Sequence, residues 1–273
     1  MTQPAFERTG WSRFDIRKPA QENVESDLRV AGIPIETMDV SSLLTSFHAF
    51  RRLSEYDGEY RLYAGTLEQC LMEKALEHYI SLILINPKPG MTGVDVGSCK
   101  SVLPILARRV YEVRYFEQDL AYPAGLNGDR IGSSADAIPL PDTSVDFMTL
   151  HCTFEHFEND ADVGFIKECA RLLKQGGMTV ILPLYLNASH CNVTGETNAD
   201  QLNLIGWDTN ADHYCVVPEW HNRFGRHYSP HAFMQRVYKP AVACGLRLRL
   251  IKICKWDAVH LDLWLRWALV IER

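Results

Sequence analysis

The sequence predicts an α/β protein with a Rossmann-like, doubly wound sheet of seven strands, mostly parallel with the last strand antiparallel. One observation is the segment 93–98, an apolar strand that ends in an acid and a glycine and leads into a helix-compatible run at 102–109. A second is the segment 171–177, which has the pattern of a helix end stopped by two glycines and precedes the apolar strand 178–182. Strand-like and helix-like runs alternate between them. A strand, a glycine turn and a helix in this order predict a nucleoside pocket at the carboxyl ends of the strands.

The N-terminal residues 1–86 are expected to form an arm and a helical cap outside the core domain, which we place at 87–273. The first 40 residues are polar and interrupted by prolines and glycines, so we expect an irregular arm there. The spacing of apolar residues then becomes helical over 40–56 and 66–85. A turn with two prolines follows and opens the core.

The core is expected to alternate strands with helices up to residue 182. The predicted strands are 92–96, 113–116, 130–133, 145–150 and 178–182, and the predicted helices are 101–109 and 162–173. Residues 184–228 break this rhythm, because they are polar, rich in Asn, Gly, His and aromatic residues, and without a clear period. We expect a lid inserted after the fifth strand. A helix at 230–242 and strands at 246–253 and 264–271 complete the domain.

Composition and charge exclude several classes of function. The chain has 47% hydrophobic and 23% charged residues, as a globular protein does, and a net charge of −6. An acidic balance argues against nucleic-acid binding and against a polybasic membrane patch. Eight scattered cysteines without a C-x-x-C pair are typical of reduced thiols. We find no signal-peptide core and no apolar window of about 18 residues, so we expect no membrane insertion and a cytoplasmic protein.

Four segments, in this order, resemble the class I S-adenosylmethionine-dependent methyltransferases, in particular those with the type 11 methyltransferase domain. The resemblance covers roughly residues 90–185 well and the last forty residues weakly. The segments are Val94-Asp95-Val96-Gly97-Ser98, the strand ending at Asp119, residues 136–146, and Glu155-His156 with residues 171–177.

The resemblance implies S-adenosylmethionine as cofactor and assigns residues to it. Asp95 would meet the ammonium group, and Gly97 would let the backbone approach the ligand closely. An acid after the second strand would accept both ribose hydroxyls; Asp119 is favoured and Glu117 is the substitute. Asp136 would accept the adenine amino hydrogens. The implied cofactor-binding set is Asp95, Gly97, Ser98, Glu117, Asp119, Asp136 and Ala137.

The glycine loop departs from the family pattern, because Cys99 and Ser101 replace two glycines and Lys100 adds a cation. An alternative is therefore a catalytically inactive methyltransferase fold that acts as a binding or scaffold protein. A nicotinamide-dependent reductase is a further alternative, and the absence of Gly-x-Gly-x-x-Gly after the first strand argues against it.

The candidate catalytic residues follow the fourth strand, which faces the methyl group in this fold. Methyl transfer to oxygen requires removal of the hydroxyl proton, and a histidine side chain exchanges protons near neutral pH. His156 is the first candidate base, with Glu155 as its partner, and His151 is the second. The alternative is that Glu155 and His156 only fix the loop.

The predicted lid supplies the candidate acceptor site. Aromatic faces stack on sugars and rings, and arginines hold phosphate or carboxylate groups, so we expect a small-molecule or saccharide acceptor. The alternative is that these side chains only pack the lid. The lid histidines match no metal-ligand spacing, so we predict no metal. The sequence makes no prediction of oligomeric state. The candidate acceptor residues are Trp220, Arg223, Arg226 and Tyr228.

Overall fold

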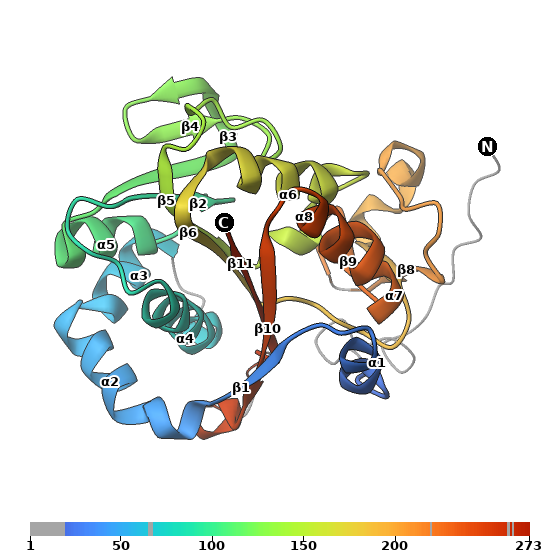
Figure 1. Cartoon of the computed structure of the whole chain (residues 1–273), viewed down its shortest axis with the longest axis horizontal. Coiled ribbons are helices and arrows are strands. Elements are labelled where there is room, and N and C mark those ends of the chain that lie inside the picture. Colours follow the sequence, from blue (N-terminus) through green and yellow to red (C-terminus); the bar gives the residue numbers. More distant parts are fainter. Residues whose placement is uncertain (1–19, 65–67, 219, 261–262, 264) are drawn as a thin grey trace.

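The computed structural model describes residues 20–64, 68–218, 220–260, 263 and 265–273. Within them, an eight-stranded sheet has the order β1-β10-β11-β6-β5-β2-β3-β4 (Figure 1). Only β11 is antiparallel to its neighbours, which confirms the predicted mostly parallel sheet with an antiparallel last strand. The strands are β1 (Ile35–Asp39), β2 (Thr92–Val96), β3 (Arg114–Asn127), β4 (Arg130–Gly132), β5 (Val145–His151), β6 (Leu173–Leu182), β10 (Arg247–Cys254) and β11 (Trp267–Glu272).

Helices cover both faces of this sheet, so the sheet is doubly wound, as predicted (Figure 1). One face carries α2 (Leu44–Leu53), α3 (Tyr56–Ala64), α4 (Glu68–Ile85) and α5 (Leu103–Tyr111). The other carries α1 (Val24–Val30), α6 (Ala161–Leu172), α7 (Pro230–Phe233) and α8 (Lys239–Ala243), with a π-helical stretch at Met234–Tyr238 between the last two. A separate hydrophobic core lies between the sheet and each layer.

The alternation of side chains along β2 decides which residues reach the α4 face. Val94 and Val96 lie in the core on the α6 side. Asp95, between them, points to the opposite side, because successive side chains of a strand alternate faces. Thr149 of β5 points the same way and donates to Asp95. A polar row therefore lies beneath α4 and α5, next to the carboxyl ends of the central strands.

The N-terminal segment differs from the predicted irregular arm. Residues 20–40 contain α1 and β1, and β1 pairs in parallel with β10 from Ile35 to Asp39. This pairing adds an edge strand to the seven predicted ones. A five-residue strand has too little alternation to be recognised locally, and its stability comes from the partner strand. Residues 1–19 lie outside the described part of the chain.

The segment after β6 folds as an insertion, as expected. It forms a second sheet of the order β8-β7-β9, built from β7 (Cys191–Gly195), β8 (His213–Val217) and β9 (Gly225–His227), with a 3-10 stretch at Glu196–Leu204. We call residues 184–228 the lid.

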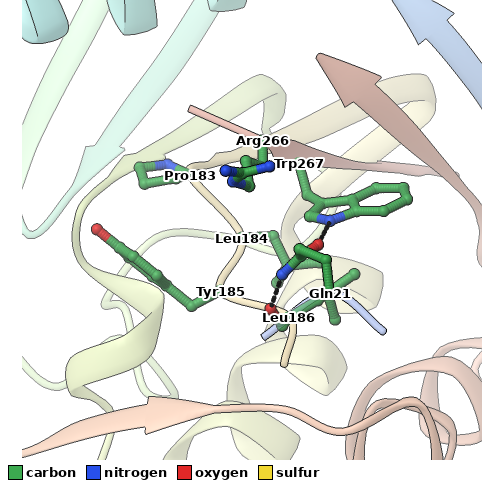
Figure 2. Close-up of a pocket in the computed structure, with 7 residues that line it drawn as sticks. All are labelled: Gln21, Pro183, Leu184, Tyr185, Leu186, Arg266 and Trp267. Atoms are coloured by element: carbon green, nitrogen blue, oxygen red, sulfur yellow. Dashed lines mark hydrogen bonds between the residues drawn. The ribbon is translucent and has the colours of Figure 1, made fainter. Parts of the chain in front are cut away.

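Gln21 fastens the base of the lid to the main sheet (Figure 2). Its Nε2 donates to the backbone oxygen of Leu186 at 2.8 Å, and its Oε1 accepts from Trp267 Nε1 at 2.8 Å. These contacts border a cavity of about 10 Å³, which is the size of one water molecule. Gln21 of the N-terminal segment thus stabilises the base of the lid.

No helix in the described part of the chain is both long and apolar enough to cross a membrane. The eight cysteines, all described, are free thiols.

Candidate active site

Two cavities open at the carboxyl ends of the parallel strands, and Gly97 borders both. The larger measures about 450 Å³, and its polar walls include Gln118, Asp119, Ser134, Cys152, Thr153 and His156. The smaller measures about 190 Å³ and is lined by Tyr60, Lys74, His78, Asp95, Lys100 and His151, among others. They lie where the strand order reverses, which is the usual ligand position in an open α/β sheet.

Asp95 is buried on β2 and borders the smaller cavity. Its Oδ1 accepts a hydrogen bond from Thr149 Oγ1 at 2.6 Å, and that hydroxyl is itself 2.5 Å from Tyr115 Oη. Oδ1 also lies 3.5 Å from His151 Nδ1. Among the described residues, Oδ2 has no hydrogen-bond partner. One carboxylate oxygen is thus fixed by the protein while the other is left for a ligand.

Position 97 requires a glycine for two reasons: its backbone conformation, and the Thr153 side chain, which leaves no space for a Cβ. The φ of Gly97 is +70°, and a Cβ there would lie 2.3 Å from Thr153 Cγ2. The turn after β2 therefore packs directly on the turn after β5. Ser98 is buried next to it, donates its backbone N–H to the Gln118 carbonyl at 2.9 Å, and borders neither cavity.

The two acids of β3 have different surroundings. Asp119 borders the larger cavity, and its carboxylate accepts the backbone N–H groups of Cys99 at 3.0 Å and Ala121 at 2.8 Å. Glu117 lies two residues earlier on β3, where it pairs with Arg108 at 3.0 Å and Arg130 at 3.5 Å. Glu117 borders neither cavity.

The segment after β4 places different residues at the larger cavity from those that we predicted. Ser134 and Ala135 line it, whereas Asp136 and Ala137 are exposed. The Asp136 side chain packs on α6, where a Cβ on Gly164 would lie 2.7 Å from it. The reason is where the strand ends: β4 stops at Gly132, and by Asp136 the chain has already turned toward α6. Ser134 lies two residues beyond the end of β4, so its distance from the strand end, rather than its charge, is the signal that identifies it.

The three candidate catalytic residues do not share one cavity, and Glu155 lines neither. His156 borders the larger one, and its Nδ1 donates to the Phe224 carbonyl at 2.5 Å. Its Nε2 is therefore the basic nitrogen of the neutral ring, 3.7 Å from Glu155 Oε1. Burial raises the pKa of Glu155. His151 borders the smaller cavity, bonds Ser81 Oγ at 2.9 Å, and has its pKa lowered by burial.

The predicted acceptor residues also separate. Trp220 stacks on the His156 ring, with 6.1 Å between ring centroids. Arg223 is half-exposed and pairs with Glu158, which lines the larger cavity. Arg226 and Tyr228 are fully buried, and their polar atoms bond to protein groups.

Residues 94–181, from β2 to β6, match the type 11 methyltransferase domain family. This stretch contains both cavity-forming turns and the Glu155-His156 pair. These residues therefore form a methyltransferase domain within the chain.

The chain has no match among curated proteins. Among solved structures, it is similar to the complex between the Haloferax volcanii Trm112 methyltransferase activator and the putative methyltransferase, with 16% identity, coverage of 80% of this chain and 94% of that chain, and a TM-score of 0.47. It is also similar to a putative sarcosine dimethylglycine methyltransferase from Galdieria sulphuraria, with 17% identity, coverage of 74% and 86%, and a TM-score of 0.43. It is similar as well to an S-adenosylmethionine-dependent methyltransferase from Mesorhizobium loti, with 13% identity, coverage of 72% of this chain and 98% of that chain, and a TM-score of 0.46.

The cofactor of the methyltransferase is S-adenosylmethionine, and the residues present fit it. This molecule joins a nucleoside with two ribose hydroxyls to a zwitterionic amino acid. The larger cavity offers the Asp119 carboxylate, and the smaller offers the open Oδ2 of Asp95. The donor and acceptor chemistry of the two cavities therefore matches the two ends of the cofactor.

Three residues at the larger cavity escaped the sequence reasoning: Gln118, Ser134 and Thr153. Ser134 and Thr153 lie just beyond the carboxyl ends of β4 and β5, and Gln118 pairs with Val96, the last residue of β2. Their signal is position alone, because none carries a charge.

Proposed function

We propose that the methyltransferase transfers the methyl group of S-adenosylmethionine to a hydroxyl oxygen of a small-molecule or saccharide acceptor. The observation that supports this proposal best is that one cavity is lined by both Asp119 and His156. A group suited to ribose hydroxyls and a group suited to proton removal thus share one space. A cytoplasmic location stays a prediction of the sequence.

The cofactor contacts follow from the cavity walls. Asp119 would accept the ribose hydroxyls, and Gln118 and Ser134 would offer polar atoms to the adenine ring. Asp95 Oδ2 would accept the ammonium group. When bound, the cofactor supplies an electrophilic methyl carbon on a sulfonium. Asp136, Ala137, Glu117 and Ser98 are not needed in this arrangement, because they border neither cavity.

His156 would remove the acceptor proton through Nε2. The Phe224 carbonyl holds Nδ1 as the donor, which fixes the tautomer and leaves Nε2 unprotonated. After Nε2 takes the proton, the ring is cationic, and Glu155 Oε1 at 3.7 Å lies where an ionised carboxylate would stabilise it. Glu155 is thus a positioning residue. His151 is less suited as the base, because it borders the smaller cavity behind Asp95.

The acceptor would lie against Trp220, whose ring extends the aromatic surface of His156. Sugars and rings stack on such faces. Arg223 lies at the rim beside Glu158 and could contact an acceptor there. This proposal does not use Arg226 and Tyr228, because both are enclosed by protein.

The test is the variant His156→Gln. Formation of S-adenosylhomocysteine is measured with the parent protein and a panel of nucleotide sugars, glycans and phenols, and turnover is then compared at the best acceptor. We expect turnover to fall at least ~100-fold while the affinity for S-adenosylhomocysteine stays within about twofold. Glu155→Gln should give a smaller loss.

The matched control is His231→Gln, which changes an exposed histidine on α7 and should leave turnover unchanged. A loss below about fivefold in His156→Gln would mean that this histidine is not the base. If the parent protein binds neither S-adenosylmethionine nor S-adenosylhomocysteine, the alternative of an inactive scaffold protein is favoured instead.

A further inference from the structure

The smaller cavity concentrates charged groups from two distant segments of the chain. Asp95 lies at its floor on β2, Lys100 comes from the turn after β2, and Lys74 comes from α4. The set is one carboxylate and two ammonium groups around about 190 Å³. Such a set is complementary to a zwitterion that presents one ammonium and one carboxylate.

We propose that Lys100 and Lys74 bind the carboxylate of the amino-acid end of S-adenosylmethionine, while Asp95 binds its ammonium group. This inference rests on the cofactor assignment in the proposed function. It gives a role to the altered glycine loop, in which a lysine provides a charge that the glycine pattern lacks.

Lys100 is exposed at the tip of the turn, and among the described residues it makes no hydrogen bond or ion pair. Its φ is +66°, in the left-handed region where a glycine would be unstrained. The turn is closed by the Ser101 backbone N–H, which donates to the Ser98 carbonyl at 2.8 Å. Strained backbone positions cluster at ligand sites, and Lys100 lies at such a cavity.

Lys74 brings the second positive charge from the helical layer. Its Nζ bonds Glu77 Oε2 at 2.8 Å and retains further N–H donors, because an ammonium group has three. Glu77 is fully buried beside Lys74, and burial raises the pKa of its carboxyl to about 7. The other groups around the cavity include His78, whose pKa is lowered by burial, and His151, which contacts Asp95. Among the residues that line the cavity, the two lysines outnumber the single carboxylate.

The experiment compares two ligands that differ by one carboxylate. Titration calorimetry measures the dissociation constants of S-adenosylmethionine and of decarboxylated S-adenosylmethionine. The dissociation constant of the decarboxylated ligand divided by that of S-adenosylmethionine reports recognition of the carboxylate, and we call it the ratio. We expect Lys100→Ala to lower this ratio about tenfold, and Lys74→Met to lower it by a similar factor. Lys100→Arg keeps the charge and should retain most of the ratio.

Two further variants separate charge from backbone effects. Lys100→Gly removes the charge and also the backbone strain, so it should lower the ratio as Lys100→Ala does. Lys88→Ala is the charge-matched control, because Lys88 is exposed in the turn before β2, at the opposite end of that strand, and its ammonium group bonds Asn86. It should leave the ratio unchanged. Lys100 is exposed, so its variants should fold even if Lys74→Met does not.

The outcomes are distinguishable. If the Lys100 variants weaken both ligands equally or not at all, the carboxylate assignment is overturned while the cofactor stands. If the ratio stays constant but the KM of an acidic acceptor rises, the lysines serve the acceptor, and the proposal also fails. If the parent binds neither ligand, the proposed function itself fails.

Discussion

Arg226 is the side chain whose replacement should have the largest effect on stability. It is fully buried, and its guanidinium pairs with both Asp208 oxygens at 2.6 Å. It also donates to the carbonyls of Phe157 at 2.7 Å and Asn159 at 2.8 Å and lies 3.2 Å from Asp162. Those carbonyls belong to the loop that follows His156. Arg226 thus joins the lid to the wall of the larger cavity.

The variant Arg226→Met leaves two acids without this partner. The side chains of Asp208 and Asp162 are 2% and 0% exposed, so water cannot replace the lost donors. Removing one partner of a buried ion pair costs about 3–5 kcal/mol. For a chain of this size, that corresponds to a fall of roughly 6–20 °C in Tm.

The assay is thermal unfolding followed by circular dichroism, with Arg223→Met as the control. Arg223 lies in the same segment, but its side chain is 44% exposed, so its ion pair should contribute below about 1 kcal/mol. The reasoning would be refuted if Arg226→Met melted within about 2 °C of the parent. A normal melt with a raised acceptor KM would instead restore Arg226 as an acceptor residue.

The ion pair between Arg226 and Asp208 also predicts how the stability of the protein depends on pH. Burial raises the pKa of Asp208, but hydrogen bonds from His190 and Arg226 outweigh it and hold the pKa well below its usual range. A carboxyl with a lowered folded-state pKa stabilises the protein above its unfolded pKa of about 4 and loses that contribution as the pH falls. The stability difference between the parent and Arg226→Met should therefore be full at pH 7 and shrink below about pH 4.

Two further predictions concern the cavities. Asp119→Asn should weaken binding of S-adenosylhomocysteine by about 1–3 kcal/mol in calorimetry, because the ribose hydroxyls lose a charged acceptor, and an unchanged affinity would contradict the ribose assignment. Glu77→Gln should gain stability relative to the parent as the pH rises from about 4.5 through about 7, since burial raises the folded-state pKa of Glu77 to about 7 and ionisation then disfavours the folded state. Denaturant titrations at pH 5 and pH 8 would test this, and a difference that does not change with pH would show that Glu77 ionises as freely in the folded chain as in the unfolded one.

The sequence alone was sufficient for the core of the fold. The apolar runs around Asp95 and Phe147 alternate with helical stretches, and such local periodicity specifies strands and helices before any tertiary contact forms. The glycine turn at Gly97 and the Glu155-His156 pair lie close to strand ends, so topology carries both to one edge of the sheet. The cofactor class followed from the same ordered segments.

Other features depended on contacts between residues that are far apart in the chain. Arg226 resembled an acceptor-binding arginine because the sequence does not reveal that Asp208 and Asn159, 18 and 67 residues away, enclose it. The two-residue difference between Asp136 and Ser134 depended on where β4 ends, which is set by its pairing with β3. Whether a polar side chain meets a ligand, a buried partner or water is decided by its surroundings in space. Local pattern determines which elements form, and tertiary packing determines which of their polar groups remain free to bind.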